Sequence, residues 1–294
     1  MTKTSSIKLI FKGVVQGVGF RPTVYRVAKQ LGSHGYVLNT GSEVEVVIDT
    51  DPDEFVSELK KNLPSLARIS SVEKISDNRS FSDFTIKKSM HGSKQSLIPV
   101  DTAICDDCLK ELFDKTNRRY HYPFTNCTVC GARYSVITDV PYDRKHTAMH
   151  DFPLCKTCND EYKDPNNRRY HAQTISCPTC GPSYSLFDEK GNKKQDTDSI
   201  RSFAKEIDAG KIGVVKSWGG MHLCCTLDQI PYFREWYHRP QKSFAVMVKD
   251  IETAEELAHI TDDQKALLTS AQRPVVLVKK KKELDIAPGL EYIG

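Results

Sequence analysis

The sequence lacks any long apolar run. None of its segments approaches the roughly 18 consecutive apolar residues that cross a bilayer, so we do not expect an integral membrane protein. The first residues also lack the apolar core of a secretory signal, which makes the cytoplasm the expected compartment. The sequence also lacks a large excess of either basic or acidic residues. The 294 residues include 42 basic and 38 acidic ones, and a net charge of +4 is too small to indicate nucleic-acid binding.

Cysteine, by contrast, is abundant. The chain has ten cysteines, and because cytoplasmic thiols stay reduced, this number favours metal binding over disulfides. Two disulfide-bonded knots in an exported protein are the alternative, which the missing secretory signal disfavours. Cys224 and Cys225 are adjacent, and we expect both to be buried. The other eight form C-x-x-C pairs, which are Cys105/Cys108, Cys127/Cys130, Cys155/Cys158 and Cys177/Cys180.

The cysteine-rich region is a duplication. Each cysteine of the first half recurs 50 positions later, and 18 residues separate the two pairs within each half. The sequence Asn-Arg-Arg-Tyr-His also occurs twice, at Asn117–His121 and Asn167–His171. Structural zinc takes four tetrahedral ligands, so the pattern predicts two four-cysteine zinc sites without a catalytic position. The ligands could pair within each half or across the two halves.

The first ninety residues predict a βαββαβ unit, the ferredoxin-like order. Helical spacing of apolar residues predicts one helix from Arg21 and a second after Asp51, which is placed to cap it. Alternating apolar residues predict strands at Ile7–Lys12 and Glu43–Asp49, and we expect further strands at Tyr36–Thr40 and near Ala67–Ile75 and Phe84–Lys87.

A glycine-rich turn, Gly13–Phe20, joins the first predicted strand to the first helix. Such a turn gathers backbone N–H groups at the positive end of a helix, which favours anion binding. Arg21 adds a permanently charged, forked side chain that matches phosphate oxygens. On spacing alone, an ordinary tight turn followed by a solvated arginine is an equal alternative.

The residues of this turn, Gly-Val-Val-Gln-Gly-Val-Gly-Phe, followed by Arg21, resemble the signature of the acylphosphatases. Tyr36–Thr40 resembles the second motif of that family, and the resemblance covers about residues 7–88. It implies that Arg21 binds the phosphate of an acyl phosphate and that Asn39 orients the attacking water. The loop residues that it implies as phosphate-binding are Gln16, Gly17, Val18, Gly19 and Phe20.

The last segment predicts an α/β layer after a polar linker, Phe187–Thr197. Alternating helices and strands carry this prediction. We expect helices from Ile200 to near Gly210, at Ile251–His259 and at Asp262–Ser270, and strands at Ile212–Lys216, Phe244–Val248 and Pro274–Val278.

Two stretches of this segment, Lys216–Leu223 and Arg239–Met247, resemble the start of a YrdC-type nucleotide-binding domain. The resemblance implies that Lys216, Arg239 and Lys242 contact the phosphates of a nucleotide. Three positions depart from the family pattern, so a decayed site is an equal alternative. The departures are Ser217, Tyr237 and Ser243.

The order of the segments resembles the HypF carbamoyltransferase family of nickel–iron hydrogenase maturation. The resemblance places an acylphosphatase-like domain at 1–92, two tandem zinc fingers at 101–186 and part of a YrdC-like domain at 197–294. It implies an α+β multidomain protein with two zinc ions. Carbamoyl phosphate would be cleaved in the first domain, and magnesium-bound ATP would turn the carbamate into carbamoyl adenylate in the third. The acceptor would be the terminal cysteine of the partner HypE.

The chain departs from the family pattern at its end. The YrdC-like part is short and the large C-terminal transfer domain is absent, so we expect an excised piece, a truncated product or one half of a protein split over two chains. A stand-alone acylphosphatase with a decayed adenylation domain is one alternative. A zinc-stapled module that binds protein or nucleic acid is another, favoured only by the pairs Arg118-Arg119 and Arg168-Arg169.

Overall fold

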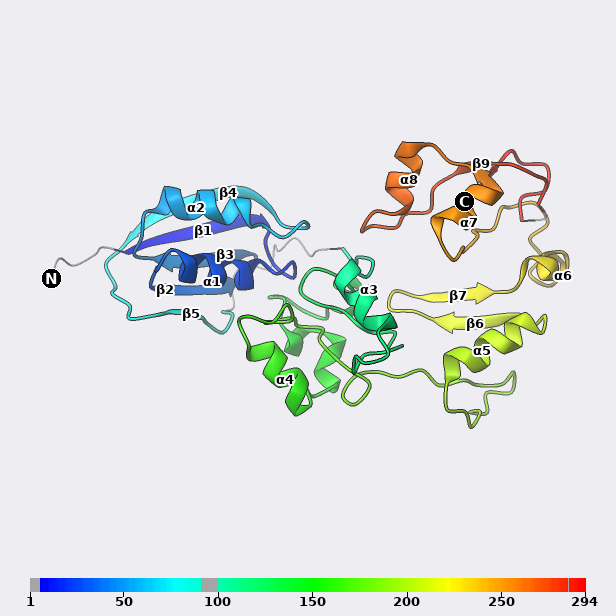
Figure 1. The fold of residues 1–294 in the computed structure, drawn as a ribbon, viewed down its shortest axis with the longest axis horizontal. Helices are drawn as coiled ribbons and strands as arrows, with labels where there is room; N and C mark the ends of the chain where they lie inside the picture. Colours follow the sequence, from blue (N-terminus) through cyan, green and yellow to red (C-terminus); the bar gives the residue numbers. More distant parts are fainter. Residues whose placement is uncertain (1–5, 91–99, 285) are drawn as a thin grey trace. The chain divides into compact units, whose positions relative to one another are not determined.

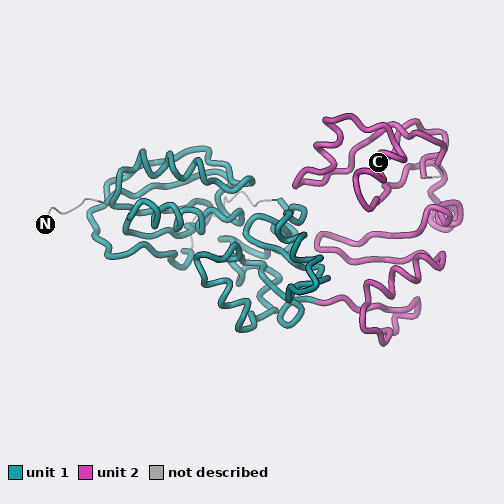
Figure 2. Tube along the Cα trace, in the orientation of Figure 1, with its two compact units in different colours: residues 1–182 teal, residues 183–294 magenta. Residues whose placement is uncertain are grey.

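The computed structural model describes residues 6–90, 100–284 and 286–294. The chain separates into two compact units, residues 1–182 and 183–294 (Figure 2). In the described part, no helix is long and apolar enough to cross a membrane. The expected domain limits at 1–92, 101–186 and 197–294 stay predictions, and residues 1–5 and 91–92 of the first lie outside the described residues.

A five-stranded sheet with two helices on one face forms the first part of unit 1 (Figure 1). The element order β1-α1-β2-β3-α2-β4 confirms the ferredoxin-like prediction, and β5 adds a strand parallel to β2. Across the sheet the strands run β4-β1-β3-β2-β5. Their bounds are β1 Ser6–Val14, α1 Phe20–Gln30, β2 Gly35–Thr40, β3 Glu43–Ile48, α2 Pro52–Lys61, β4 Arg68–Asp77 and β5 Phe84–Ile86.

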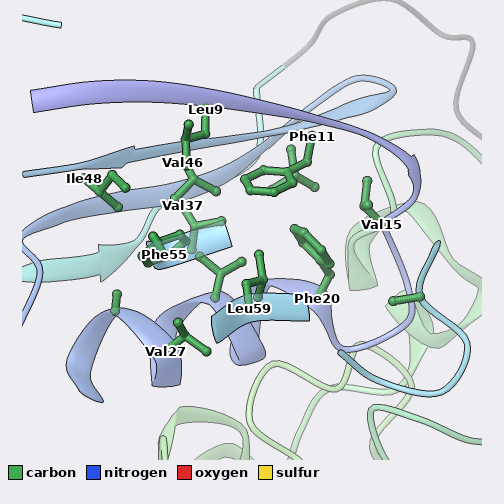
Figure 3. Packing of buried hydrophobic residues seen from close by; sticks show 14 of the residues in the cluster. Leu9, Phe11, Val15, Phe20, Val27, Val37, Val46, Ile48, Phe55 and Leu59 are labelled. Atoms are coloured by element: carbon green, nitrogen blue, oxygen red, sulfur yellow. The ribbon is translucent and has the colours of Figure 1, made fainter. Parts of the chain in front are cut away.

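The core of this part lies between the sheet and its helices. Leu9 and Phe11 of β1 point from the sheet towards Phe55 and Leu59 of α2 (Figure 3). All four side chains are fully buried, and Phe20 packs edge-on against Phe11 with ring centroids 5.3 Å apart. Phe20 directly precedes Arg21, so this packing anchors the start of α1 to the sheet.

β1 ends in an irregularity that begins the glycine-rich loop. Its register with β4 shifts between Lys12 and Gly13. Gly13 has a φ of 123°, and a Cβ there would lie 2.2 Å from the carbonyl oxygen of Arg68. Only glycine fits this bend, which takes the chain out of the sheet towards α1.

The rest of unit 1 consists of two short modules built alike. Each has one eight-residue helix that begins directly after the first cysteine of its half, α3 (Asp106–Phe113) and α4 (Lys156–Lys163). Between them run three short 3-10 turns, η1 (Tyr134–Val136), η2 (Arg144–His146) and η3 (Ala148–Asp151). We call residues 100–182 the finger region.

Unit 2 contains mixed helices and small sheets (Figure 1). A hairpin pairs β6 with β7, and a three-stranded sheet has the order β10-β9-β8. The bounds are α5 Ser199–Asp208, β6 Gly213–Lys216, β7 Met221–Cys224, η4 Leu227–Gln229, α6 Ile230–Trp236, α7 Ile251–Leu257, β8 Ala258–His259, α8 Asp262–Leu268, β9 Val278–Lys280 and β10 Tyr292–Ile293.

Three sequence predictions in unit 2 are wrong in detail. Residues 244–248 form no strand, although the amides of Phe244 and Val246 donate to the carbonyls of Ile286 and Gly294. The strand expected at Pro274–Val278 begins only at Val278. Cys224 and Cys225 are partly exposed rather than buried. Large apolar side chains remain exposed here, among them Met247 at 95% and Val275 at 73%, so these residues pack little against the rest of the unit.

Candidate active site and metal centres

The glycine-rich loop presents backbone donors at the start of α1. Gly17 and Gly19 have φ values of 68° and 78°, in the left-handed region that favours glycine. Gly19 is the N-cap of α1, and among the described residues no side chain caps this helix. The first N–H groups of α1 therefore have no side-chain partner at the positive end of the helix, which suits an anion.

Gln16 braces the loop from within. Its side-chain amide donates to the carbonyls of Gly41 and Glu43 at 2.9 and 3.1 Å, and its carbonyl accepts from the backbone N–H of Tyr142 at 3.3 Å. The side chain of Gln16 is thus committed to the framework. Of the phosphate contacts expected from Gln16, the backbone one is consistent with this geometry.

Arg21 is buried at the loop, with 8% of its surface exposed. Its Nη2 lies 3.0 Å from an oxygen of Asp143, and its Nη1 donates to the hydroxyl of Ser89 at 3.1 Å. A guanidinium has five N–H donors, so these two bonds leave donors for phosphate oxygens. Arg21 is therefore held in place without being saturated.

Asn39 is buried in β2 with both side-chain polar atoms unpartnered. It is 1% exposed, and within the described residues neither its Oδ1 nor its Nδ2 makes a hydrogen bond. A buried amide without partners costs about 1–3 kcal/mol, so its retention suits a bound water or ligand. Asn39 does not line the cavity at Arg21 among the described residues, so the structure brings Arg21 and the loop together but leaves Asn39 outside that lining.

The finger region covers the loop. A cavity of about 20 Å³ is lined by Val15–Gly17 and Gly19–Pro22 on one side. On the other side it is lined by the finger residues Thr128, Arg133, Tyr142, His171, Ala172 and Gln173. This volume holds about one ordered water, so a phosphoryl group needs more room than the present arrangement offers.

Two finger residues set the electrostatics of this cavity. Arg133 is 1% exposed and donates to the carbonyl of Gly17. Its other four hydrogen bonds reach carbonyls of the finger region, at Cys127, Thr128, Cys130 and Ala132. Burial, reinforced by nearby Arg21, lowers the pKa of His171 to about 4. His171 is therefore neutral at pH 7, and the positive charge at the cavity comes from Arg21 and Arg133.

The eight paired cysteines form two separate clusters, each within one half of the duplication. In each cluster the four sulfurs lie within 4.8 Å of one another. The Sγ–Sγ distances are 3.6–3.7 Å along Cys105, Cys127, Cys130 and Cys108, and 3.7–3.8 Å along Cys155, Cys177 and Cys180. Sulfurs about 2.3 Å from a tetrahedral zinc lie roughly 3.8 Å apart, so both clusters suit structural zinc. All four positions are sulfurs, which leaves none for a substrate.

The arginine pairs bind across the two modules. Arg118 of the first module donates to the sulfur of Cys158 at 3.1 Å, and Arg168 of the second donates to Cys108 at 3.0 Å. Arg119 pairs with Glu161 in the same reciprocal manner as Arg169 pairs with Glu111. Burial raises the pKa of Glu161, but its hydrogen bonds with Arg119 and Arg118 overcome this effect and hold it at about 2. The pairs therefore offset thiolate and carboxylate charge inside the protein, which explains them without nucleic acid.

The candidate nucleotide residues of unit 2 bond to backbone carbonyls or lie beside residues that do. Lys216 donates to the carbonyl of Ser217 at 2.6 Å, within its own turn. Arg239 donates to the carbonyl of Ser243 at 3.2 Å and lies 4.9 Å from the ring centre of Phe244. Arg234 donates to the backbone carbonyls of both Arg239 and Lys242, at 2.9 and 3.0 Å, which holds these two residues close together. Lys216 and Arg239 are thus engaged with backbone carbonyls close to them in sequence.

Known families match nearly the whole chain. The HypF finger family matches residues 104–137 and 154–187, the acylphosphatase family residues 7–86, and the telomere recombination family, which includes the YrdC proteins, residues 205–294. Carbamoyltransferase HypF2 of Cupriavidus necator is 43% identical over 99% of this chain, and probable carbamoyltransferase HypF of Methanocaldococcus jannaschii is 46% identical over 95%. The chain belongs to the HypF carbamoyltransferase family. It spans 38% of the length of each of these two HypF proteins.

Solved HypF structures agree with this membership. Full-length HypF in its phosphate- and nucleotide-bound form matches with a TM-score of 0.92 at 37% identity, covering 99% of this chain and 39% of that one. HypF of T. kodakarensis matches with a TM-score of 0.90 at 42% identity, covering 99% of this chain and 38% of that one. The first part alone is 42% identical to an acylphosphatase of Caldivirga maquilingensis, covering 86% of that protein. The predicted family and fold class are thereby confirmed.

Sequence reasoning missed the residues of the finger region that contact the glycine-rich loop Gly13–Phe20 or Arg21. Arg133, Asp143 and His171 lie more than 100 positions from the loop residues that they approach. No local motif near them indicates this contact. The one available signal was the repeated histidine at His121 and His171, which marks equivalent positions but not which of them faces the loop.

Proposed function

We propose that the loop Gly13–Phe20, with Arg21 and Asn39, cleaves carbamoyl phosphate into carbamate and inorganic phosphate. One observation carries this proposal. The uncapped start of α1 and the buried guanidinium of Arg21, which has N–H donors left over, line the same cavity. Backbone N–H groups and an arginine fork match the oxygens and the charge of a phosphoryl group.

The proposed step needs no covalent nucleophile, because carbamoyl phosphate is an activated mixed anhydride. A water oxygen bonds to phosphorus while the bond from phosphorus to the bridging oxygen breaks. The bridging oxygen leaves with the carbamate, and the protons of the water pass to the product phosphate and solvent. Arg21 and the loop amides stabilise charge on the phosphoryl oxygens, and Asn39 orients the water.

We further propose that the chain contributes to the full HypF reaction. Unit 2 would use magnesium-bound ATP to convert carbamate into carbamoyl adenylate, with Lys216, Arg239 and Lys242 as the candidate nucleotide contacts. A transfer domain, on this chain or a separate one, would then pass the carbamoyl group to the terminal cysteine of HypE in the cytoplasm. The phosphate- and nucleotide-bound HypF structure supports the two ligand classes.

A second candidate is an acylphosphatase without a working adenylation site. The bonds of Lys216 to the carbonyls of Ser217 and Trp218 in its own turn, together with the departures at Ser217, Tyr237 and Ser243, favour it. Exchange of pyrophosphate into ATP separates the two candidates. Exchange that depends on carbamoyl phosphate supports adenylation, and its absence alongside active phosphate release supports the second candidate.

Phosphate release tests the leading proposal. The zinc-loaded chain should release inorganic phosphate from carbamoyl phosphate, with one equivalent of phosphate for each carbamoyl phosphate consumed. Acetyl phosphate serves as a second acyl phosphate and glucose 6-phosphate as an unactivated ester. Activity on the two acyl phosphates but not on the ester fits the proposed site. No turnover of either acyl phosphate above the uncatalysed rate would refute it.

A further inference from the structure

The carboxylate that meets Arg21 comes from the finger region, 122 positions along the chain. Asp143 Oδ1 lies 3.0 Å from Arg21 Nη2, and the two side chains are only 19% and 9% exposed. A partly buried pair of this kind is screened little by solvent, so it fixes the direction of the guanidinium more firmly than a surface pair would.

Asp143 is itself held from both sides. Before it, the backbone N–H of Tyr142 donates to the side chain of Gln16. After it, the backbone N–H of Arg144 donates to the side chain of Gln173 at 2.8 Å, and the guanidinium of Arg144 donates to the carbonyls of Gln173, Ile175 and Phe152. The carboxylate therefore projects from a pinned segment, which makes it a fixed anchor for Arg21.

We propose that Asp143 is a positioning residue of the acyl-phosphate site, holding the Arg21 guanidinium against the loop so that the finger region completes the site. This inference rests on the proposed function. Asp143 takes one donor of Arg21 and Ser89 takes another, which leaves the remaining N–H groups for the phosphate. The carboxylate also places a negative charge beside the bound phosphate, so it orients Arg21 and weakens phosphate binding.

This dual effect predicts different outcomes for two substitutions. Asp143→Asn keeps an oxygen that accepts from Arg21 but removes the charge, so kcat should stay within about threefold of the wild type. Asp143→Ala frees the guanidinium, and because a misplacement of about 1 Å can cost 100-fold in rate, we expect kcat to fall at least about tenfold. Both variants should bind inorganic phosphate more tightly, since both remove the neighbouring negative charge.

The test measures kcat for carbamoyl phosphate and the inhibition constant of inorganic phosphate, using the zinc-loaded full chain. Asp151→Ala, which removes an exposed carboxylate of the same region, is the matched control and should change neither. Asp143→Ser keeps a polar side chain too short to reach Arg21, so it replaces Asp143→Ala if that variant is insoluble. Zinc content and melting temperature are compared for each variant.

Two results would overturn the inference. One is a wild-type kcat in Asp143→Ala or Asp143→Ser. The other is a loss of kcat in Asp143→Ala that is equally large when Arg21 is also replaced by Ala, because Asp143 would then act independently of Arg21. If the wild type releases no phosphate, the proposed function fails. A double-mutant cycle of Asp143→Ala and Arg21→Ala on the direct binding of inorganic phosphate then still decides the inference. Non-additive effects show that Asp143 acts through Arg21, and additive effects show that it does not.

Discussion

At the scale of single residues, the buried side-chain amide of Asn39 lowers the stability of the folded protein. Its two buried polar atoms make no hydrogen bond with the described protein residues. Asn39→Leu has a similar shape without those atoms, so we expect the melting temperature to rise, by the equivalent of about 1 kcal/mol. We expect kcat for carbamoyl phosphate to fall at least about 100-fold, because no side chain orients the water.

Thermal melts and phosphate-release assays on this variant check both effects. Leu38→Ile, an apolar exchange at the neighbouring buried position of β2, is the control and should leave kcat unchanged. A fully active Asn39→Leu would contradict the role of Asn39.

His171 gives a prediction about pH. Burial, with Arg21 nearby, lowers its pKa to about 4 in the folded state, against an ordinary value of 6.5. Between these values the unfolded chain binds more protons than the folded one, so stability falls as pH decreases from 6.5 to 4. The contribution of His171 to this loss reaches about 3 kcal/mol at most.

When the pH falls from 7.5 to 4.5, the free energy of unfolding should therefore decrease less for His171→Asn than for the wild type. Asparagine tolerates the left-handed φ of 56° at this position. The equivalent exposed residue of the first module provides the control, His121→Asn, whose acid profile should match the wild type. Urea unfolding at both pH values checks this, and an unchanged profile for His171→Asn would show that His171 is not the acid-sensitive group.

At the scale of elements, the two finger modules support each other's metal sites. Arg118 and Arg119 contact the sulfur of Cys158 and pair with Glu161, although they belong to the first module. Replacing both with Ala leaves Glu161 without its pairs beside the second cluster. We expect the second site to lose zinc affinity by about 10–100-fold, the usual effect of removing an outer hydrogen-bonding partner, while the first site loses less.

Alkylation of cysteines during chelator challenge, followed by peptide mapping, reports each site separately. The double Arg118→Ala, Arg119→Ala variant should expose Cys155–Cys180 to alkylation before Cys105–Cys130. The mirror variant, Arg168→Ala with Arg169→Ala, should reverse the order. Loss of zinc from the module that carries the substituted arginines would contradict the reciprocal arrangement.

The same elements show what sequence reasoning could reach. The cysteine clusters were predictable because they depend on local spacing, and the loop before Arg21 was predictable because its residues resemble the acylphosphatase signature. Asp143 and Arg133 were not, since their roles depend on how the finger region packs over the loop. Residues 244–248 form a continuous apolar run, as a buried strand does. Among the described residues, however, their backbone N–H groups reach only the carbonyls of Ile286 and Gly294, which are too few for a ladder. The apolar residues of a segment indicate that it should be buried, but they do not reveal whether another strand lies beside it to pair with.

At the scale of the whole molecule, the two units differ in how they are stabilised. All eight zinc-ligating candidates lie in residues 1–182, and unit 1 also has the core around Leu9 and Phe11. Unit 2 exposes large apolar side chains, including Met247 and Val275. We therefore expect about two zinc ions per chain and two thermal transitions, with unit 2 unfolding first.

Calorimetry with and without a zinc chelator checks this division. The chelator should lower the transition of unit 1 and leave that of unit 2 in place, because metal binding stabilises only the unit that holds the ligands. A single transition, or equal shifts of both, would contradict the independence of the two units.

The central claim is that Arg21 and its loop cleave carbamoyl phosphate. The most direct measurement is the rate of inorganic phosphate release by the zinc-loaded chain, compared between the wild type and Arg21→Ala. Arg26→Ala, on the same helix α1, is the matched control. We predict at least about a 100-fold loss for Arg21→Ala, typical of removing one charge-stabilising donor, and near wild-type turnover for Arg26→Ala. Equal rates for the wild type and Arg21→Ala would contradict the claim.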